Sequence, residues 1–188
     1  MHSFTTERLL IRLLIEEDEA FYCYQYTDKK MMRIIGEPMS YEKASKAFFR
    51  ALKANSADKK TVMTWAIVDR SSCEIIGTQA LSWLKPTQTP KPSVDNIEQV
   101  EIGIMLATKA NGKLLPEEAV AGLMEYGFNY LALDRINAFY AKKNHATKRI
   151  LDKLGYINAS ELQETKTNIS YQYFDKNCWC KAVIIDLL

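Results

Sequence analysis

The sequence has few of the residues that build metal centres. Its 188 residues include two histidines, His2 and His145, and four cysteines. Cys178 and Cys180 flank a tryptophan, but no second cysteine pair stands at ligand spacing, so zinc would lack a sensible set of four ligands. We therefore expect no metal site. We expect the two thiols to share one face of a strand and to pack as small apolar groups.

The sequence also lacks a long apolar run, a secretory leader and a dominant charge. No stretch approaches the roughly 20 apolar residues that span a bilayer, and Met1 to Arg12 lacks the apolar core of a leader peptide. With 25 basic and 23 acidic side chains the formal net charge is +2, which is not typical of a dedicated nucleic-acid or membrane binder. These absences, together with the sparse cysteines, predict a cytoplasmic protein with neither kind of partner.

The residues that are present fit one globular α+β domain spanning 1–188, because 47% of them are hydrophobic and 26% are charged. Ser40 is expected to begin a helix and Gly155 to end one. A segment with three prolines, 85–97, reads as an exposed excursion from a sheet. Apolar periodicity predicts strands at 9–13, 62–69, 74–83, 99–107 and 136–142, strand-like segments near 170–173 and 179–188, and helices at 16–26, 40–55, 117–131 and 146–154.

The most informative feature is a strand that leads through a turn into a helix, from Gln99 to Leu131. Such a junction directs unpaired backbone N–H groups and the positive end of a helix dipole at one point, which suits a pyrophosphate. Two residues of the turn do not suit a phosphate. Leu114 has a Cβ and a large side chain where a small residue is expected, and Pro116 lacks an N–H donor. Lys113 could replace some of that donor strength by charge, although a lysine on a surface turn is usually only solvated.

Four segments, in order, resemble the GNAT N-acetyltransferases: Thr6 to Arg12, Arg33 to Pro38, Glu101 to Ile104, and Asn144 to Tyr156. The chain is most similar to the branch that includes ribosomal-protein alanine acetyltransferases and, more distantly, spermidine and antibiotic acetyltransferases. The resemblance implies the GNAT fold, a mixed and mostly antiparallel central sheet flanked by helices and splayed between its fourth and fifth strands. It also implies that acetyl-CoA lies in the splay as cosubstrate, and that the acceptor is a primary amine of a small molecule or of a peptide or protein N-terminus.

The resemblance assigns the catalytic groups. An amine that attacks a thioester must lose a proton, and the developing oxyanion must be stabilised. Glu101 is the best candidate for the general base, although Glu98 and Glu101 read equally well as solvent-facing charges on a strand. The tyrosine that many GNAT enzymes use to protonate the leaving thiolate is replaced by Leu151. Water or Tyr156 is then left as the acid.

The cofactor-binding residues implied by the resemblance lie on the strand, in the turn and beyond the next strand. Asn144 resembles the family asparagine that bonds the pantetheine arm, and Thr147 a small hydroxyl residue that approaches it, but both also read as helix caps. The family turn has glycine at the position of Leu114 and glycine or alanine at that of Pro116. The other residues expected at acetyl-CoA are Met105 and Leu106, through their backbone amides, and Asn111, Gly112, Lys113, Leu114 and Glu117.

Two other classes of function remain open, because a fold does not fix a function. A degenerate GNAT domain would bind a ligand or partner, or would catalyse a different reaction in the same cleft. An RNA- or ribosome-associated module is the weaker option, since no basic stripe is present. The sequence also leaves a homodimer open.

Overall fold

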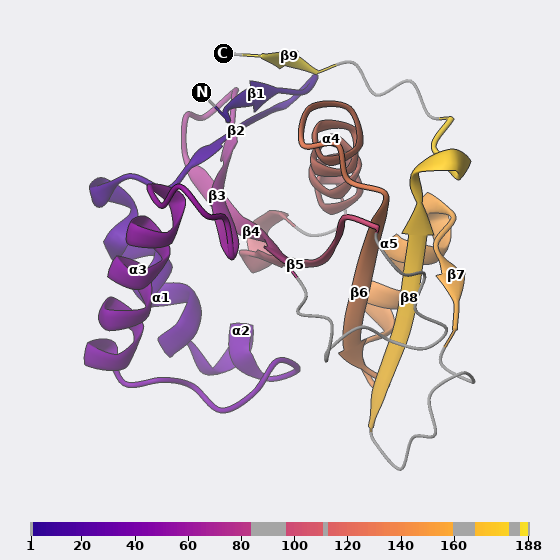
Figure 1. Ribbon diagram of the computed structural model, residues 1–188. Coiled ribbons are helices and arrows are strands. Elements are labelled where there is room, and N and C mark those ends of the chain that lie inside the picture. Colours follow the sequence, from indigo (N-terminus) through magenta and orange to yellow (C-terminus); the bar gives the residue numbers. More distant parts are fainter. Residues whose placement is uncertain (1, 84–96, 111–112, 160–167, 181–184, 188) are drawn as a thin grey trace.

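One sheet forms the centre of the molecule (Figure 1). The computed structural model describes all residues except 1, 84–96, 111–112, 160–167, 181–184 and 188. Within the described residues the sheet has nine strands in the order β7-β8-β6-β5-β4-β3-β2-β1-β9. The strands are β1 (Phe4–Thr5), β2 (Leu9–Leu13), β3 (Val62–Asp69), β4 (Ile75–Trp83), β5 (Gln99–Leu106), β6 (Arg135–Ala141), β7 (Ile157–Asn158), β8 (Ile169–Asp175) and β9 (Asp186–Leu187).

The helices cover both faces of this sheet. Figure 1 shows α1 and α3 on one face and α4 on the other, with α5 beside α4. The longer helices are α1 (Glu19–Thr27), α3 (Tyr41–Asn55), α4 (Leu115–Tyr130) and α5 (His145–Leu154), and α2 (Lys29–Met32) is a single turn.

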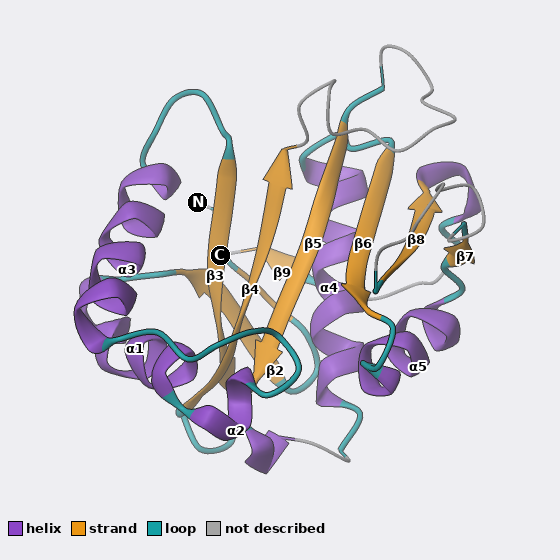
Figure 2. Cartoon of the chain, turned by 90° about the horizontal axis from the view of Figure 1, so that it is seen from below, coloured by secondary structure: helices purple, strands orange, loops and turns teal. Residues whose placement is uncertain are grey.

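The sheet separates between β5 and β6. These neighbours run parallel, whereas all other neighbouring strands are antiparallel. Their pairing covers only Gln99 to Glu101 opposite Arg135 to Asn137, yet β5 continues to Leu106 and β6 to Ala141. Figure 2 shows the two strands side by side where they begin and apart at their arrowheads. This confirms the predicted fold class, with β5 and β6 as the fourth and fifth strands when counting starts at β2.

Alternation along the central strands produces a core on each face. On β3, Trp65 and Ile67 pack into the larger core beneath α4, whereas Ala66 and Val68 face the smaller core beneath α3. Full burial of such side chains contributes about 1.5–3 kcal/mol each. Both faces of the central strand β3 are therefore packed.

Helix ends follow the local signals in the sequence. Ser40 caps α3 through a hydrogen bond from the Lys43 N–H to its Oγ (3.3 Å), and α3 ends at Asn55 as predicted. Gly155 ends α5 in the left-handed conformation, with φ of 89°. Helix α4 begins at Leu115 rather than at residue 117, because proline is tolerated in the first helical turn, where its missing N–H is not needed.

The C-terminal segment differs from the expectation of one strand with two buried thiols. Residues Lys176–Cys178 form a 3₁₀ turn, and Cys178 and Cys180 are both exposed, so the expected core packing of these thiols is wrong. The turn interrupts the alternation and directs Trp179 inward instead. Its ring lies 5.8 Å from that of Phe128 and 5.7 Å from that of Phe174.

Three further features can be examined only within the described residues: the segment with three prolines, metal-binding groups and membrane-spanning helices. The segment 85–97 lies outside them except for residue 97. Among the described residues, no group of three or more His, Cys, Asp and Glu side chains could hold a metal ion. Within that same part of the chain, no helix is long and apolar enough to cross a membrane.

Candidate active site

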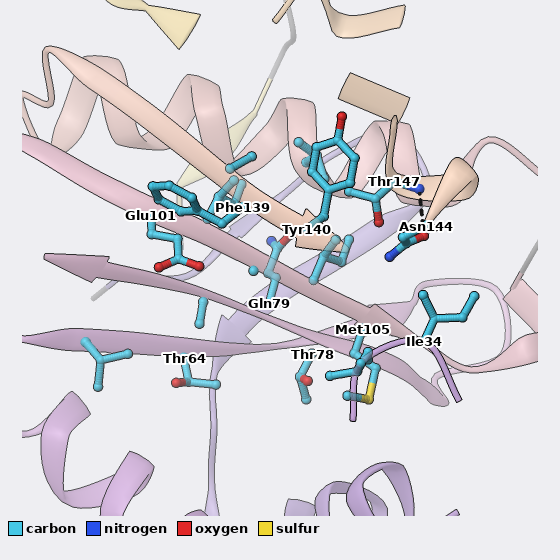
Figure 3. Close-up of a pocket in the computed structure, with 18 of the residues that line it drawn as sticks. Ile34, Thr64, Thr78, Gln79, Glu101, Met105, Phe139, Tyr140, Asn144 and Thr147 are labelled. Atoms are coloured by element: carbon cyan, nitrogen blue, oxygen red, sulfur yellow. Dashed lines mark hydrogen bonds between the residues drawn. The ribbon is translucent and has the colours of Figure 1, made fainter. Parts of the chain in front are cut away.

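The gap between β5 and β6 opens into a cavity of about 770 Å³ (Figure 3). This volume is in the range of small-molecule binding sites. Both layers of helices and both separated strands contribute to its walls. The lining residues include Tyr22 and Arg50 beneath one face, Val120, Ile150 and Leu151 beneath the other, 101–105 of β5, 138–141 of β6, and Asn144 and Thr147 where the gap is widest.

Glu101 lies at the closed end of the gap. It is the last residue of β5 that pairs with β6, and its carboxylate is among the groups that line the cavity (Figure 3). Burial raises the pKa of Glu101 above its usual value. No described residue forms a hydrogen bond or ion pair with its carboxylate. Glu98, by contrast, is exposed and accepts a hydrogen bond from the Trp83 indole (2.6 Å), so the solvent-facing interpretation fits Glu98 and not Glu101.

The strand register decides which backbone amides face the gap. Ala107 N–H donates to the Ile76 carbonyl of β4 (2.8 Å). Because antiparallel pairs alternate, the amide of Met105 is also directed toward β4, opposite Thr78, and not into the gap as expected. The amides of Ile104 and Leu106 point the other way, past the end of the pairing with β6. Leu106 therefore keeps the expected orientation, and Ile104 takes the place of Met105.

Asn144 and Thr147 lie together at the wide end of the gap, and both line the cavity (Figure 3). The Asn144 side chain caps α5, because its Oδ1 accepts a hydrogen bond from the Thr147 N–H (3.1 Å). The capping role is thus shown. It uses the oxygen of the amide, so the Asn144 nitrogen can still donate to a ligand, and contact with the cofactor stays a prediction.

The turn before α4 is only partly described, because Asn111 and Gly112 lie outside the described residues. Leu114 has φ of 60° and is 53% exposed, so leucine occupies the left-handed conformation that glycine adopts most easily. Lys113 is exposed, and Glu117 in the first turn of α4 lies 3.6 Å from the Lys153 ammonium. A carboxylate at this position repels a phosphate, so the structure gives Glu117 no clear role in binding acetyl-CoA.

The N-terminal motif holds this turn in place. Glu118 of α4 accepts hydrogen bonds from the Thr6 hydroxyl (2.5 Å) and from Arg8 N–H and Nε (2.8 and 2.6 Å). Arg8 also donates to the Lys113 carbonyl (2.8 Å). Burial would raise the pKa of Glu118, but these hydrogen bonds lower it. The motif that resembles the family is thus tied by hydrogen bonds to the start of α4, and Glu118 is engaged there rather than in the cavity.

The comparisons with known proteins decide the family. The sequence model of the acetyltransferase (GNAT) domain family matches residues 8–157 of this chain. The chain belongs to the GNAT acetyltransferase family. The uncharacterized N-acetyltransferase YnaD of Bacillus subtilis (strain 168) is 30% identical over 152 residues, which are 80% of each chain. The protein is therefore an acetyltransferase of the GNAT type, and a degenerate domain without this activity is not favoured.

Solved structures support the GNAT fold. A ribosomal-protein-S5-alanine acetyltransferase from Vibrio fischeri superposes with a TM-score of 0.70 at 18% identity and covers 95% of this chain and 99% of that one. A spermidine N-acetyltransferase from Vibrio cholerae, in complex with CoA and spermine, gives a TM-score of 0.70 at 16% identity over 90% and 96% of the two chains. At such identities the likeness shows the fold alone.

The structure does not place Tyr156, the candidate general acid, in the cavity. Leu151 is buried in the cavity wall. Tyr156 is 6% exposed, packs against Phe174, and is not among the residues that line the cavity. Burial raises its pKa. Tyr140 does line the cavity, but its hydroxyl lies beside Ser170 of β8. This placement does not support Tyr156 as the acid and leaves water for that role.

Sequence reasoning missed Gln79 of β4, whose side chain also lines the GNAT cavity (Figure 3). A signal was present, because Gln79 alternates with Gly77 and Leu81 and so falls on the core-facing side of its strand. A glutamine at such a position requires hydrogen-bond partners.

Leu114→Gly is expected to stabilise the fold by about 1 kcal/mol, because the left-handed conformation costs a non-glycine residue about 1–2 kcal/mol and glycine almost nothing. Urea unfolding, read as the midpoint at constant slope, measures the change. Leu114→Ala is the control, since it removes the exposed side chain and keeps the Cβ. Equal stability of the two variants would show that relief of the left-handed conformation does not exceed the entropy that glycine adds to the unfolded chain.

Proposed function

We propose that this enzyme transfers the acetyl group of acetyl-CoA to a primary amine, either of a small molecule or of a protein N-terminus. The observation that carries the proposal is the position of Glu101. An ionisable carboxylate with a raised pKa stands at the closed end of a gap between two strands, where their pairing stops and their edge amides become free.

The gap fits a narrow, extended donor. The amides of Ile104 and Leu106 can donate to carbonyl oxygens there, and Asn144 and Thr147 lie where such a chain would enter. Acetyl-CoA supplies the thioester carbon that the amine attacks. In support, the spermidine N-acetyltransferase of similar fold was solved with CoA.

The residues of the chain account for the proton and the charge. Glu101 takes a proton from the attacking amine, directly or through one water, and its raised pKa makes it a stronger base than an exposed glutamate. As the nitrogen–carbon bond forms, the amide of Ile104 stabilises the charge on the carbonyl oxygen. The carbon–sulfur bond then breaks, and the leaving thiolate takes its proton from water.

The nucleotide end of CoA would lie at the start of α4. The N-terminus of this 16-residue helix attracts negative charge, and Lys113 is exposed beside it. Pro116 removes one N–H donor from this end. The affinity of the pyrophosphate for this turn is therefore expected to be lower than for a turn built of glycines.

The acceptor is proposed only as a class. The resemblance to the ribosomal-protein-alanine branch is supported by one neighbour of similar fold, which makes a protein N-terminus one option and a small amine the other. A panel of polyamines, amino acids and N-terminal peptides, analysed by mass spectrometry for a gain of one acetyl group, distinguishes them.

CoA is expected to stabilise the folded enzyme. At 100 times the dissociation constant the gain in unfolding free energy is about 2.7 kcal/mol, or roughly 5–10 °C in Tm for a chain of this size. Thermal unfolding with CoA, with adenosine as the control ligand, measures it. A shift below about 1 °C at millimolar CoA would contradict acetyl-CoA as the donor.

A further inference from the structure

Gln79 is a buried amide without a partner. Its side chain is 2% exposed, and neither its nitrogen nor its oxygen has a hydrogen-bond partner among the described residues. An unmade hydrogen bond of this kind costs about 1–3 kcal/mol. Gln25, the other buried glutamine near the gap, is fully satisfied, because it donates to the Met105 carbonyl and accepts from the Thr78 hydroxyl (2.9 Å each). Gln79 is thus an exception within its own neighbourhood.

The surroundings of Gln79 are apolar and border the cavity. On the sheet it lies between Trp65 of β3 and Ile104 of β5. On the same face of the sheet the cavity is lined by Val120 of α4 and Leu151 of α5. Figure 3 shows the Gln79 amide pointing away from β4, to the side on which β5 and β6 are drawn. A single amide in an apolar channel matches a ligand whose own amides are separated by methylene groups.

The position of Gln79 along the gap indicates which part of a bound donor it would contact. Gln79 is level with Ile104, three residues beyond Glu101, which is roughly 10 Å along a strand. Alternation also puts Gln79 and Glu101 on opposite faces of the sheet. A donor that enters from the wide end and presents its thioester near Ile104, to an amine held by Glu101, would therefore place its sulfur and the chain that follows close to the level of Gln79.

We infer that Gln79 binds the pantetheine arm of the acyl-CoA donor through a hydrogen bond to one of the two amides of that arm. This inference rests on the proposed function. In pantetheine the first amide follows the sulfur after two methylenes and the second follows after two more. With the thioester carbonyl at the Ile104 amide, the first pantetheine amide lies just beyond the level of Gln79, within reach of its side chain. The side-chain amide offers one donor and one acceptor group, as each pantetheine amide does. Gln79 thereby anchors the middle of the donor. This contact compensates for the altered turn at Leu114 and Pro116, which binds the nucleotide end of the donor less well.

The experiment compares two ligands and two variants. CoA contains the pantetheine arm, and 3′-phosphoadenosine 5′-diphosphate contains only the nucleotide end. Gln79→Leu removes the amide at similar volume. Gln172→Leu is the matched control, because Gln172 is also buried, lies on β8 outside the cavity, and donates to Asp152 (2.8 Å). Calorimetry measures the dissociation constants, and thermal unfolding without ligand measures stability.

For Gln79→Leu we expect CoA to bind about 5- to 30-fold more weakly, with the affinity for 3′-phosphoadenosine 5′-diphosphate unchanged. We also expect its Tm without ligand to equal or exceed that of the wild type, because an unsatisfied amide has been removed. Gln172→Leu should lower the Tm and leave the ratio of the two affinities unchanged. Equal binding of CoA by Gln79→Leu and the wild type would overturn the inference alone, whereas a wild type that binds neither ligand would overturn the proposed function with it.

Discussion

Glu101→Gln is expected to lower turnover by about 100- to 10,000-fold, with little change in the affinity for acetyl-CoA. Glutamine keeps the size and polarity of the side chain but cannot accept the proton that the amine must lose. Since the Glu101 carboxylate has no hydrogen-bond or ion-pair partner among the described residues, the substitution breaks no such interaction there. Steady-state kinetics with an identified acceptor, together with calorimetry for acetyl-CoA, separates the two quantities.

The pH dependence gives a second measurement of the same role. Burial raises the pKa of Glu101 above its ordinary value of 4.5, so the ionised, basic form is lost at a higher pH than for an exposed glutamate. The kcat/KM of the wild type should fall as the pH is lowered through this raised pKa, and Glu101→Gln should lack that limb. Folding stability changes with pH in the opposite direction to kcat/KM. Because the folded pKa exceeds the unfolded one, Glu101 costs stability as the pH rises between them, and Glu101→Gln should be slightly more stable than the wild type at neutral pH.

Glu98→Gln is the matched control for Glu101→Gln. It changes an exposed carboxylate just before the start of β5 and keeps an acceptor for the Trp83 indole. Its turnover should remain near that of the wild type. Near-wild-type turnover of Glu101→Gln would remove Glu101 from the mechanism and would require a base supplied by water alone.

Gly103→Trp is expected to reduce kcat/KM by at least about 100-fold without unfolding the protein. Gly103 lines the cavity two residues beyond Glu101 and on the same face of the sheet. A Cβ added there would meet no heavy atom within 4 Å, so a side chain can start from Gly103 without a clash, and an indole would extend into the cavity. An indole beside Glu101 would displace the acceptor from its reactive position, and even small misplacements of reacting groups cost about 100-fold.

Gly77→Ala provides the contrast for Gly103→Trp. Its added Cβ would lie 2.7 Å from the Met105 carbonyl oxygen, so this small substitution is expected to lower stability by about 1–3 kcal/mol. For Gly103→Trp the Tm should stay within about 2 °C of the wild type, and the affinity for CoA should change little. Full activity in this variant would show that the amine does not approach from the face that carries Glu101.

Much of the fold follows from local signals. Ser40 and Gly155 begin and end helices because each acts on backbone groups within a few residues of itself. The strand periodicity of 62–69 and of 99–107 predicted β3 and, within one residue, β5 for the same reason. Glu101 could be proposed as the base because its motif resembles the GNAT family in order and spacing. The short strands β1, β7 and β9 carry no such signal, since two residues are too few for a period.

The sequence by itself determined the order of the elements, the family and the identity of the candidate base. Only the tertiary structure decided which groups reach the gap. It directed the amides of Ile104 and Leu106 into the gap and that of Met105 toward β4, and it left the Gln79 amide without a partner. Local propensities act over one or two turns of chain. The direction of an amide and the burial of a side chain depend instead on the register with strands that lie far away in the sequence, and shifting that register by one residue reverses both.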